Sequence, residues 1–197
     1  MVYTEIYSPP EVKRRQILRY AGARDGFDGM EELLDECLGI VLPKTVYKVC
    51  WCEIPLVVYD GGVDLGFMKT NSKGLAKNLK NCTSAVVFAA TIGIETDRLI
   101  SRYAAVSPVK SLMFQAIGAE RIESLCDIFN AEVSARKAYT RSRFSPGYGD
   151  FSLEAQRDIF RVLEPSRKIG LNLNDSFLMS PSKSVTAIIG VSDSKQE

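Results

Sequence analysis

The sequence predicts an α+β protein with a central mixed or largely antiparallel sheet, flanked by helices that include one long helix. Helical and β-prone segments alternate without the strict strand–helix–strand rhythm of a parallel sheet. Gly61-Gly62 joins two β-prone runs and indicates a hairpin. The run "TSAVVFAATIG" at 83–93 is apolar almost throughout, which indicates a central strand covered on both faces.

The elements of the N-terminal half follow from capping residues and apolar periodicity. Ser8-Pro9-Pro10-Glu11 predicts the start of a helix over 11–23. The other elements expected before the central strand are a helix over 30–40, strands over 45–54, 56–60 and 63–69, and a short helix over 72–80.

The C-terminal half contains the longest predicted helix. Ser107 is its expected N-cap, Pro108 lies in its first turn, and it runs to about Tyr139. Ser152 is expected to cap a later helix that ends before Pro165. The remaining predicted elements are a helix over 95–106, two β-prone runs on either side of Pro181, and a frayed tail over 193–197.

Composition limits the functional classes. The 197 residues allow one domain, expected over 1–197, and 46% hydrophobic residues are enough for a real core. Lys plus Arg number 25 and Asp plus Glu number 24, so no charge excess points to nucleic acid or an anionic membrane. The N-terminus has no apolar signal region, and no apolar run is long enough to span a bilayer. The sequence therefore predicts a cytoplasmic protein.

Cysteine and histidine usage narrows the chemistry further. An odd number of cysteines, five, without a signal peptide predicts free thiols. Cys50 and Cys52 share a face of a predicted strand, and filling of the core is favoured over a redox or metal role. Histidine is absent, which excludes histidine-based acid–base catalysis and histidine metal ligands from this chain. No phosphate-loop, dinucleotide-binding or nucleophile-elbow motif appears.

A carboxylate interrupts the apolar face of the long helix. On a helical wheel Glu123 falls among apolar positions, where a lone charge would be very unfavourable. Either Glu123 reaches past the edge of this arc to water, or it faces a polar groove and meets a ligand hydroxyl or ammonium group. The apolar arc comprises Leu112, Ala116, Ala119, Ile122, Cys126, Phe129 and Val133.

The loop "RSRFSPGYGDFS" at 141–152 follows this helix and is rich in residues with special backbone properties. Arg143 offers a planar fork that suits a carboxylate. The Pro146-Gly147 bend could leave the backbone N–H and C=O of Ser145 free for a ligand. Tyr148 supplies a flat face for an adenine or a sulfonium ion.

Part of this loop is expected to be structural. Gly149 would permit close approach of another group, whereas Asp150 and Ser152 are expected as turn acceptor and helix cap. The alternative for Arg143 is an intrachain salt bridge within a tightly built loop. An internal ion pair with no cavity beside the bend would favour that alternative.

Arg143, Gly147 and Tyr148 form an R-x-x-x-G-Y pattern within "RFSPGYGD". Together with "ATIG", "ESLCDIFNAE" and "DSFLMSPSKSVTAIIG", this pattern resembles the activation domain of cobalamin-dependent methionine synthase, in its short free-standing bacterial form. The resemblance covers about 83–191 and is weaker over 1–82.

The resemblance implies that the chain binds S-adenosylmethionine beside a cobalamin carried by a separate methionine synthase or related methyltransferase chain. A methyl group from S-adenosylmethionine and one electron from a flavodoxin-type donor would then restore methylcobalamin. Arg143 would pair with the methionine carboxylate, the backbone of Ser145 would contact the ligand, and Glu123 would take one of its polar groups. Gly147 and Tyr148 would line the pocket. No catalytic residue and no metal ligand is implied in this chain.

The chain also departs from this family. The distal ligand-contacting Tyr and the N-terminal acidic residue have no match, and "GDFSLEAQ" replaces a stretch that carries Cys and His in the family. These departures leave a second interpretation, a docking module for a corrinoid protein that kept the fold and lost S-adenosylmethionine binding. An unrelated methyltransferase is disfavoured, because no Gly-rich nucleotide loop follows a first strand.

Overall fold

The computed structural model describes residues 1–23 and 29–192 and is built around a five-stranded sheet. The strand order is β1-β2-β6-β10-β7, and every pairing in this sheet is antiparallel. The predicted α+β class is therefore confirmed, whereas the tail expected to be frayed lies outside the described residues. The strands are β1 (Tyr3–Tyr7), β2 (Tyr47–Pro55), β6 (Ser84–Thr91), β10 (Ser184–Ser192) and β7 (Tyr139–Thr140).

β6 is the central strand, as its apolar sequence predicts. Its side chains alternate strictly between the two faces of the sheet. Val86, Phe88 and Ala90 belong to one apolar cluster, and Val87 and Ala89 belong to another. Because both faces are covered, the strand needs no polar alternation.

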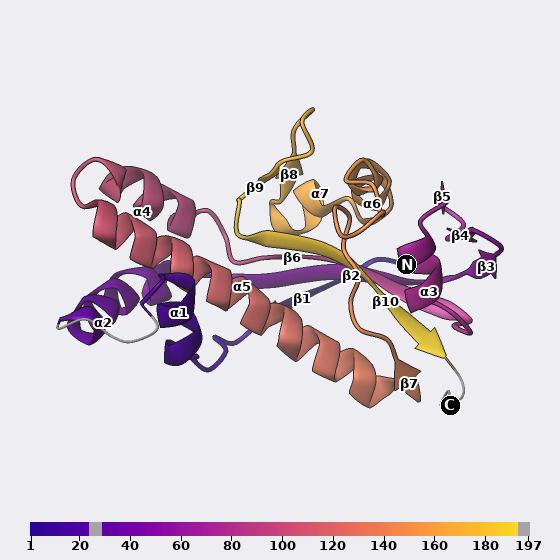
Figure 1. Cartoon of the computed structure of the whole chain (residues 1–197), viewed down its shortest axis with the longest axis horizontal. Helices are drawn as coiled ribbons and strands as arrows, with labels where there is room; N and C mark the ends of the chain where they lie inside the picture. Colours follow the sequence, from indigo (N-terminus) through magenta and orange to yellow (C-terminus); the bar gives the residue numbers. More distant parts are fainter. Residues whose placement is uncertain (24–28, 193–197) are drawn as a thin grey trace.

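Helices cover the two faces of the sheet and extend the molecule to one side (Figure 1). The C-terminal half of α5 packs on one face, and α6 and α7 pack on the other. The N-terminal half of α5 continues beyond the sheet and packs with α1, α2 and α4 around a third apolar cluster. These helices are α1 (Arg14–Tyr20), α2 (Met30–Val41), α4 (Glu95–Ala104), α5 (Pro108–Arg136), α6 (Ala155–Leu163) and α7 (Pro165–Ile169).

Small elements complete the chain. The predicted hairpin at Gly61-Gly62 is confirmed, since Tyr59 pairs with Gly62 and Gly61 takes a positive φ of 82°. That backbone conformation strains any residue with a Cβ atom, which explains the glycine. The elements are the short helix η1 (Leu42–Lys44), α3 (Lys73–Asn78), a sheet of β3 (Val57–Tyr59), β4 (Gly62–Asp64) and β5 (Lys69–Thr70), and a pair of β8 (Asn172–Leu173) and β9 (Met179–Ser180).

The N-terminal segment differs from the prediction in two ways. Residues 3–7 form an edge strand that the sequence analysis did not include, and Tyr3 stacks on Trp51 with ring centroids 4.7 Å apart. The first helix starts at Arg14 rather than at Glu11. The reason is tertiary, because Arg121 of α5 donates hydrogen bonds to the backbone carbonyls of Pro10 and Glu11 and holds this segment extended across α5.

Two predictions about helix ends need correction, and a third is confirmed. Ser107 precedes α5 as predicted, but its side chain makes no capping hydrogen bond. Ser152 accepts a hydrogen bond from the Glu154 N–H, yet α6 itself begins at Ala155. α6 ends at Leu163, before Pro165 as predicted, and Pro165 then opens α7, where its fixed φ suits the first helical position.

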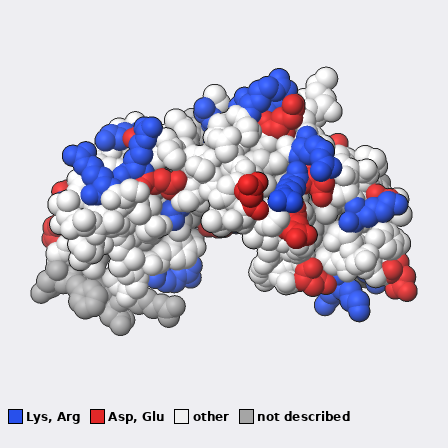
Figure 2. All heavy atoms as spheres, turned by 90° about the horizontal axis from the view of Figure 1, so that it is seen from above, with Lys and Arg blue, Asp and Glu red and all other residues white. Residues whose placement is uncertain are grey.

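Seen from above, the molecule is hollowed between its helical end and its sheet end (Figure 2). Lysines, arginines and carboxylates are interspersed over this face, in keeping with a formal net charge of +1. Among the described residues, no helix combines the length and the apolar character needed to cross a membrane.

Candidate functional site

A β-bulge aims Arg143 at the long helix. Thr140 pairs with Val191, and the Arg141 N–H donates to the Gly190 carbonyl, which continues the same register. Phe144 pairs with Ile188, so this strand advances three residues while β10 advances two. One extra residue reverses the side-chain alternation.

The bulge therefore sends two nearby arginines to opposite faces of the sheet. The Arg141 side chain lies against Gly190, next to Leu79 and Cys82, and it hydrogen-bonds the Lys80 carbonyl at 3.3 Å. The Arg143 side chain instead reaches α5. In a regular strand, side chains two residues apart lie on the same face, so without the bulge Arg141 and Arg143 would share a face.

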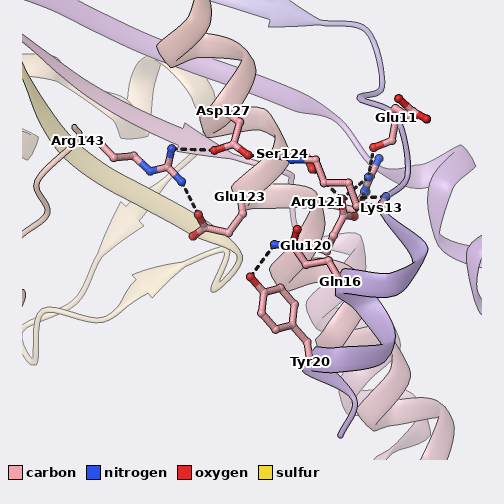
Figure 3. A network of polar contacts seen from close by, with 10 residues as sticks. All are labelled: Glu11, Lys13, Gln16, Tyr20, Glu120, Arg121, Glu123, Ser124, Asp127 and Arg143. Carbon is pink, nitrogen blue, oxygen red and sulfur yellow. Dashed lines mark hydrogen bonds and ion pairs between the residues drawn. The ribbon is translucent and has the colours of Figure 1, made fainter. Parts of the chain in front are cut away.

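Arg143 meets two carboxylates that lie one helical turn apart on α5 (Figure 3). It forms an ion pair with Glu123, and its Nη1 lies 3.0 Å from Oδ1 of Asp127. Burial alone would lower the pKa of the Arg143 guanidinium, but both carboxylates outweigh burial and its pKa is raised. The intrachain salt bridge considered from the sequence does exist.

These ion pairs remain accessible to solvent. The side chains are 23% exposed for Arg143, 40% for Glu123 and 49% for Asp127. Exposed ion pairs are held by about 0–1 kcal/mol, so a ligand of complementary charge can exchange with one of them. The arrangement can bind a molecule that carries both a carboxylate and an ammonium group.

The structure favours one alternative for Glu123 and corrects one expectation about α5. The Glu123 side chain is 40% exposed, as expected if it reaches past the edge of the apolar arc, whereas Leu112, expected inside the arc, is 51% exposed. The carboxylate that is truly buried on α5 is Glu120, which is fully buried and ion-paired to Arg121. The helical wheel did not predict the buried positions of α5 because this helix packs on other helices along its N-terminal half and on the sheet along its C-terminal half. Its buried face is therefore not a single apolar arc.

Asp127 and Lys13 belong to the cluster and were missed by sequence reasoning. Lys13 Nζ lies 2.9 Å from Oδ2 of Asp127, which therefore bridges Lys13 and Arg143 (Figure 3). Burial would raise the pKa of Asp127, but hydrogen bonds from Lys13 and Arg143 hold it below its usual value. The spacing of Asp127 from Glu123, four residues, was a usable signal.

The loop beyond Arg143 presents the other predicted residues. Gly147 takes a φ of 85°, which favours glycine, and its N–H donates to the Phe151 carbonyl. The Ser145 carbonyl accepts the Tyr148 N–H at 3.1 Å, so this carbonyl is not free as expected. In the described part of the chain, the Ser145 N–H has no hydrogen-bond partner.

Tyr148 lies at the tip of the loop, 69% exposed, with its ring edge-on to Phe144. Within residues 1–23 and 29–192, no hydrogen bond or ion pair joins Tyr148 to the Arg143 cluster. Asp150 is structural, as expected, but by a different contact. Its carboxylate accepts hydrogen bonds from the Ser72 hydroxyl and the Lys73 N–H, which ties the loop to the start of α3.

A cavity of about 600 Å³ lies near the start of the loop, on the face of the sheet opposite to the Arg143 cluster, and is lined by Arg141, Ser142 and Phe144. A smaller cavity of about 260 Å³ borders the cluster itself, where Lys13 and Asp127 line it. The described residues also provide no strand partner for the outer edge of β10 from Ser184 to Ala187. Ser145 follows Phe144 where this open edge begins, and unpaired edges can accept ligands.

The cysteines take no part in the site. All five are buried free thiols, in agreement with the predicted core-filling role. Cys50 and Cys52 face α6 within one apolar cluster. Burial raises the pKa of the Cys50 thiol to about 12, which makes it a poor nucleophile at neutral pH.

Comparisons with known proteins agree on one group. A family model, "Vitamin B12 dependent methionine synthase, activation domain", matches residues 75–196, well over half of the chain. A solved structure, "Crystal Structure of the MetH Reactivation Domain bound to AdoHcy", matches with a TM-score of 0.69. The match covers 100% of this chain and 80% of that chain at 16% identity, which supports a shared fold. No curated protein matches the chain.

Proposed function

Because this chain belongs to the activation-domain family of vitamin B12-dependent methionine synthase, we propose that it binds S-adenosylmethionine at the Arg143 cluster. The whole chain, 1–197, would act as one reactivation subunit for a methionine synthase or related methyltransferase chain that carries the cobalamin. S-adenosylmethionine would supply the methyl group for cob(II)alamin, with one electron from a flavodoxin-type donor. The residues of this chain would bind and orient the methyl donor.

The observation that carries the proposal is the solvent-exposed cluster of one guanidinium and two carboxylates beside an R-x-x-x-G-Y loop. Arg143 would take the carboxylate of the methionine moiety in a bidentate contact. Glu123 would accept hydrogen bonds from the ammonium group of the methionine moiety, and the Ser145 N–H would donate a hydrogen bond to the ligand. Gly147 lets the ligand approach the bend, and Tyr148 offers an exposed ring to the adenosyl part. The related structure bound to AdoHcy supports a ligand of this class.

Isothermal titration with S-adenosylmethionine tests the proposal, with the chain alone and with a corrinoid partner. Arg143→Ala is expected to weaken binding by about 2 kcal/mol, roughly 30-fold, because a charged partner would be left unpaired. Arg141→Ala is the matched control, since this arginine faces the other side of the sheet. Equal affinity of Arg143→Ala and the native chain would contradict the assigned site.

A second candidate function is a docking module for a corrinoid protein without S-adenosylmethionine binding. The observation that favours it is that both arms of the Arg143 fork already contact internal carboxylates. Recovery of a corrinoid protein in a pull-down, together with no binding heat for S-adenosylmethionine, would select this function. Binding heat that Arg143→Ala abolishes would exclude it.

A further inference from the structure

The two carboxylates that hold Arg143 are not equivalent. In the part of the chain that the structure describes, Glu123 forms an ion pair with Arg143 alone. Asp127 pairs with Arg143 at 3.0 Å and also with Lys13 at 2.9 Å. A carboxylate that is paired with two cations keeps a favourable electrostatic interaction when it releases one of them, so its release costs less free energy.

Lys13 is held where it is by contacts that do not involve Arg143. Its backbone N–H donates to Oε1 of Glu120 at 3.3 Å. The carbonyls of Pro10 and Glu11, just before it, accept hydrogen bonds from Arg121 at 2.7 and 2.6 Å. The backbone that presents Lys13 is therefore anchored to α5 by a buried ion pair, whatever happens at the exposed cluster (Figure 3).

The charges of the cluster set the class of ligand. Arg143 and Lys13 carry two positive charges, and Glu123 and Asp127 carry two negative charges, so the cluster is neutral. A ligand with a carboxylate only would bring a third negative group to Arg143. An α-amino acid moiety brings one charge of each sign and leaves the balance unchanged.

Resting on the proposed function, we infer that Asp127 and Lys13 form an exchange pair that controls access to Arg143. Asp127 occupies one arm of the guanidinium in the free protein. When the carboxylate of the ligand arrives, Asp127 gives up that arm and keeps Lys13 as its partner, while Glu123 takes the ligand ammonium group. Asp127 is thus a competitor of the ligand, and Lys13 weakens that competition.

This inference predicts effects of opposite sign for two neighbouring positions. Asp127→Asn removes the competitor and is expected to tighten S-adenosylmethionine binding about two- to fivefold, the range of an exposed ion pair. In Lys13→Met, Asp127 keeps Arg143 as its one cationic partner and competes with the ligand more strongly. S-adenosylmethionine binding is therefore expected to weaken by a similar factor. The double variant is expected to match Asp127→Asn, since Lys13 acts only through Asp127.

Titration calorimetry of the full chain measures these affinities, with thermal unfolding of each variant alongside. The gain in Asp127→Asn is expected for S-adenosylmethionine and S-adenosylhomocysteine, and not for decarboxylated S-adenosylmethionine, which has no carboxylate to compete. A merely structural Asp127 would give unchanged or weaker binding in Asp127→Asn, and that result overturns the exchange. If neither the native chain nor Asp127→Asn binds any of the three ligands, both the exchange and the proposed function are contradicted. Native binding without the gain overturns the exchange alone.

Discussion

Two groups of ion pairs lie three residues apart on α5, and they differ in burial rather than in chemistry. Glu120 and Arg121 have side chains that are 0% and 1% exposed. Glu123 and Arg143 have side chains that are 40% and 23% exposed. Both groups pair a guanidinium with a carboxylate, so residue type alone does not separate a structural pair from a binding site.

The difference lies in what the chain itself supplies. Around the buried pair, the Ser124 hydroxyl and the Lys13 N–H bond to Glu120, and Arg121 bonds two backbone carbonyls. Breaking such a pair leaves an uncompensated buried charge. The exposed group is held by a few long side chains in contact with water, and water or a ligand can replace any of these contacts. Only the second group is suited to exchange with a ligand.

The largest expected effect is on stability. Glu120→Ala leaves Arg121 buried without its carboxylate and is expected to lower the free energy of unfolding by about 3–5 kcal/mol. Glu123→Ala, three residues further along the same helix, is the matched control and is expected to change it by less than about 1 kcal/mol. Urea denaturation of both variants measures the difference. Equal losses would mean that burial does not distinguish the two groups.

The second effect concerns ligand binding and the bulge. Deletion of Ser142 removes the extra residue and makes Arg143 follow Arg141 directly, so the regular alternation of side chains is expected to keep Arg143 on the α5 side of the sheet. S-adenosylmethionine binding should then fall much less than in Arg143→Ala, for which the expected loss is roughly 2 kcal/mol. Titration calorimetry of both variants measures the losses, and far-ultraviolet circular dichroism checks that the sheet persists. A loss in the deletion variant as large as in Arg143→Ala would show that the face taken by Arg143 is not enough to set the site.

Much of the fold could be predicted because its signals are local. The apolar run of β6, the glycines of the hairpin and the periodicity of the helices need no distant partner. β1 was missed because five residues at an edge gain their stability from pairing with β2. The start of α1 was misplaced because Arg121, more than a hundred residues away, binds the carbonyls that precede it.

The site was predicted in part for the same reason. The concentration of Pro and Gly after Arg143 marked the loop, and the helical wheel drew attention to Glu123. Asp127 was within reach of the same reasoning, one turn further along the helix. Lys13 was not, because it comes to Asp127 from 114 residues away. The bulge was also hidden, since it depends on register with β10.

A smaller effect tests the coupling inside the exposed group. A double-mutant cycle of Lys13→Met and Asp127→Asn is expected to give a coupling free energy of about 0.2–1 kcal/mol in the stability of the free protein. Both side chains are close to half exposed, so salt should reduce the coupling. Thermal unfolding at low and high sodium chloride measures it. A coupling of several kcal/mol would place this pair with the buried group instead.

The smallest effect is on the pH dependence of stability. The folded pKa of Asp127 lies below its unfolded value of about 3.9, because Lys13 and Arg143 favour the carboxylate against the effect of burial. Its contribution is therefore fully present above the unfolded pKa and is lost as the pH falls through the folded pKa. The stability difference between the native chain and Asp127→Asn should be constant from about pH 5 to 7 and shrink towards pH 3, by less than about 1 kcal/mol because the group is half exposed. Urea denaturation across this range measures the difference. A difference that grew on acidification would reverse the sign of the coupling and contradict the cation contacts assigned to Asp127.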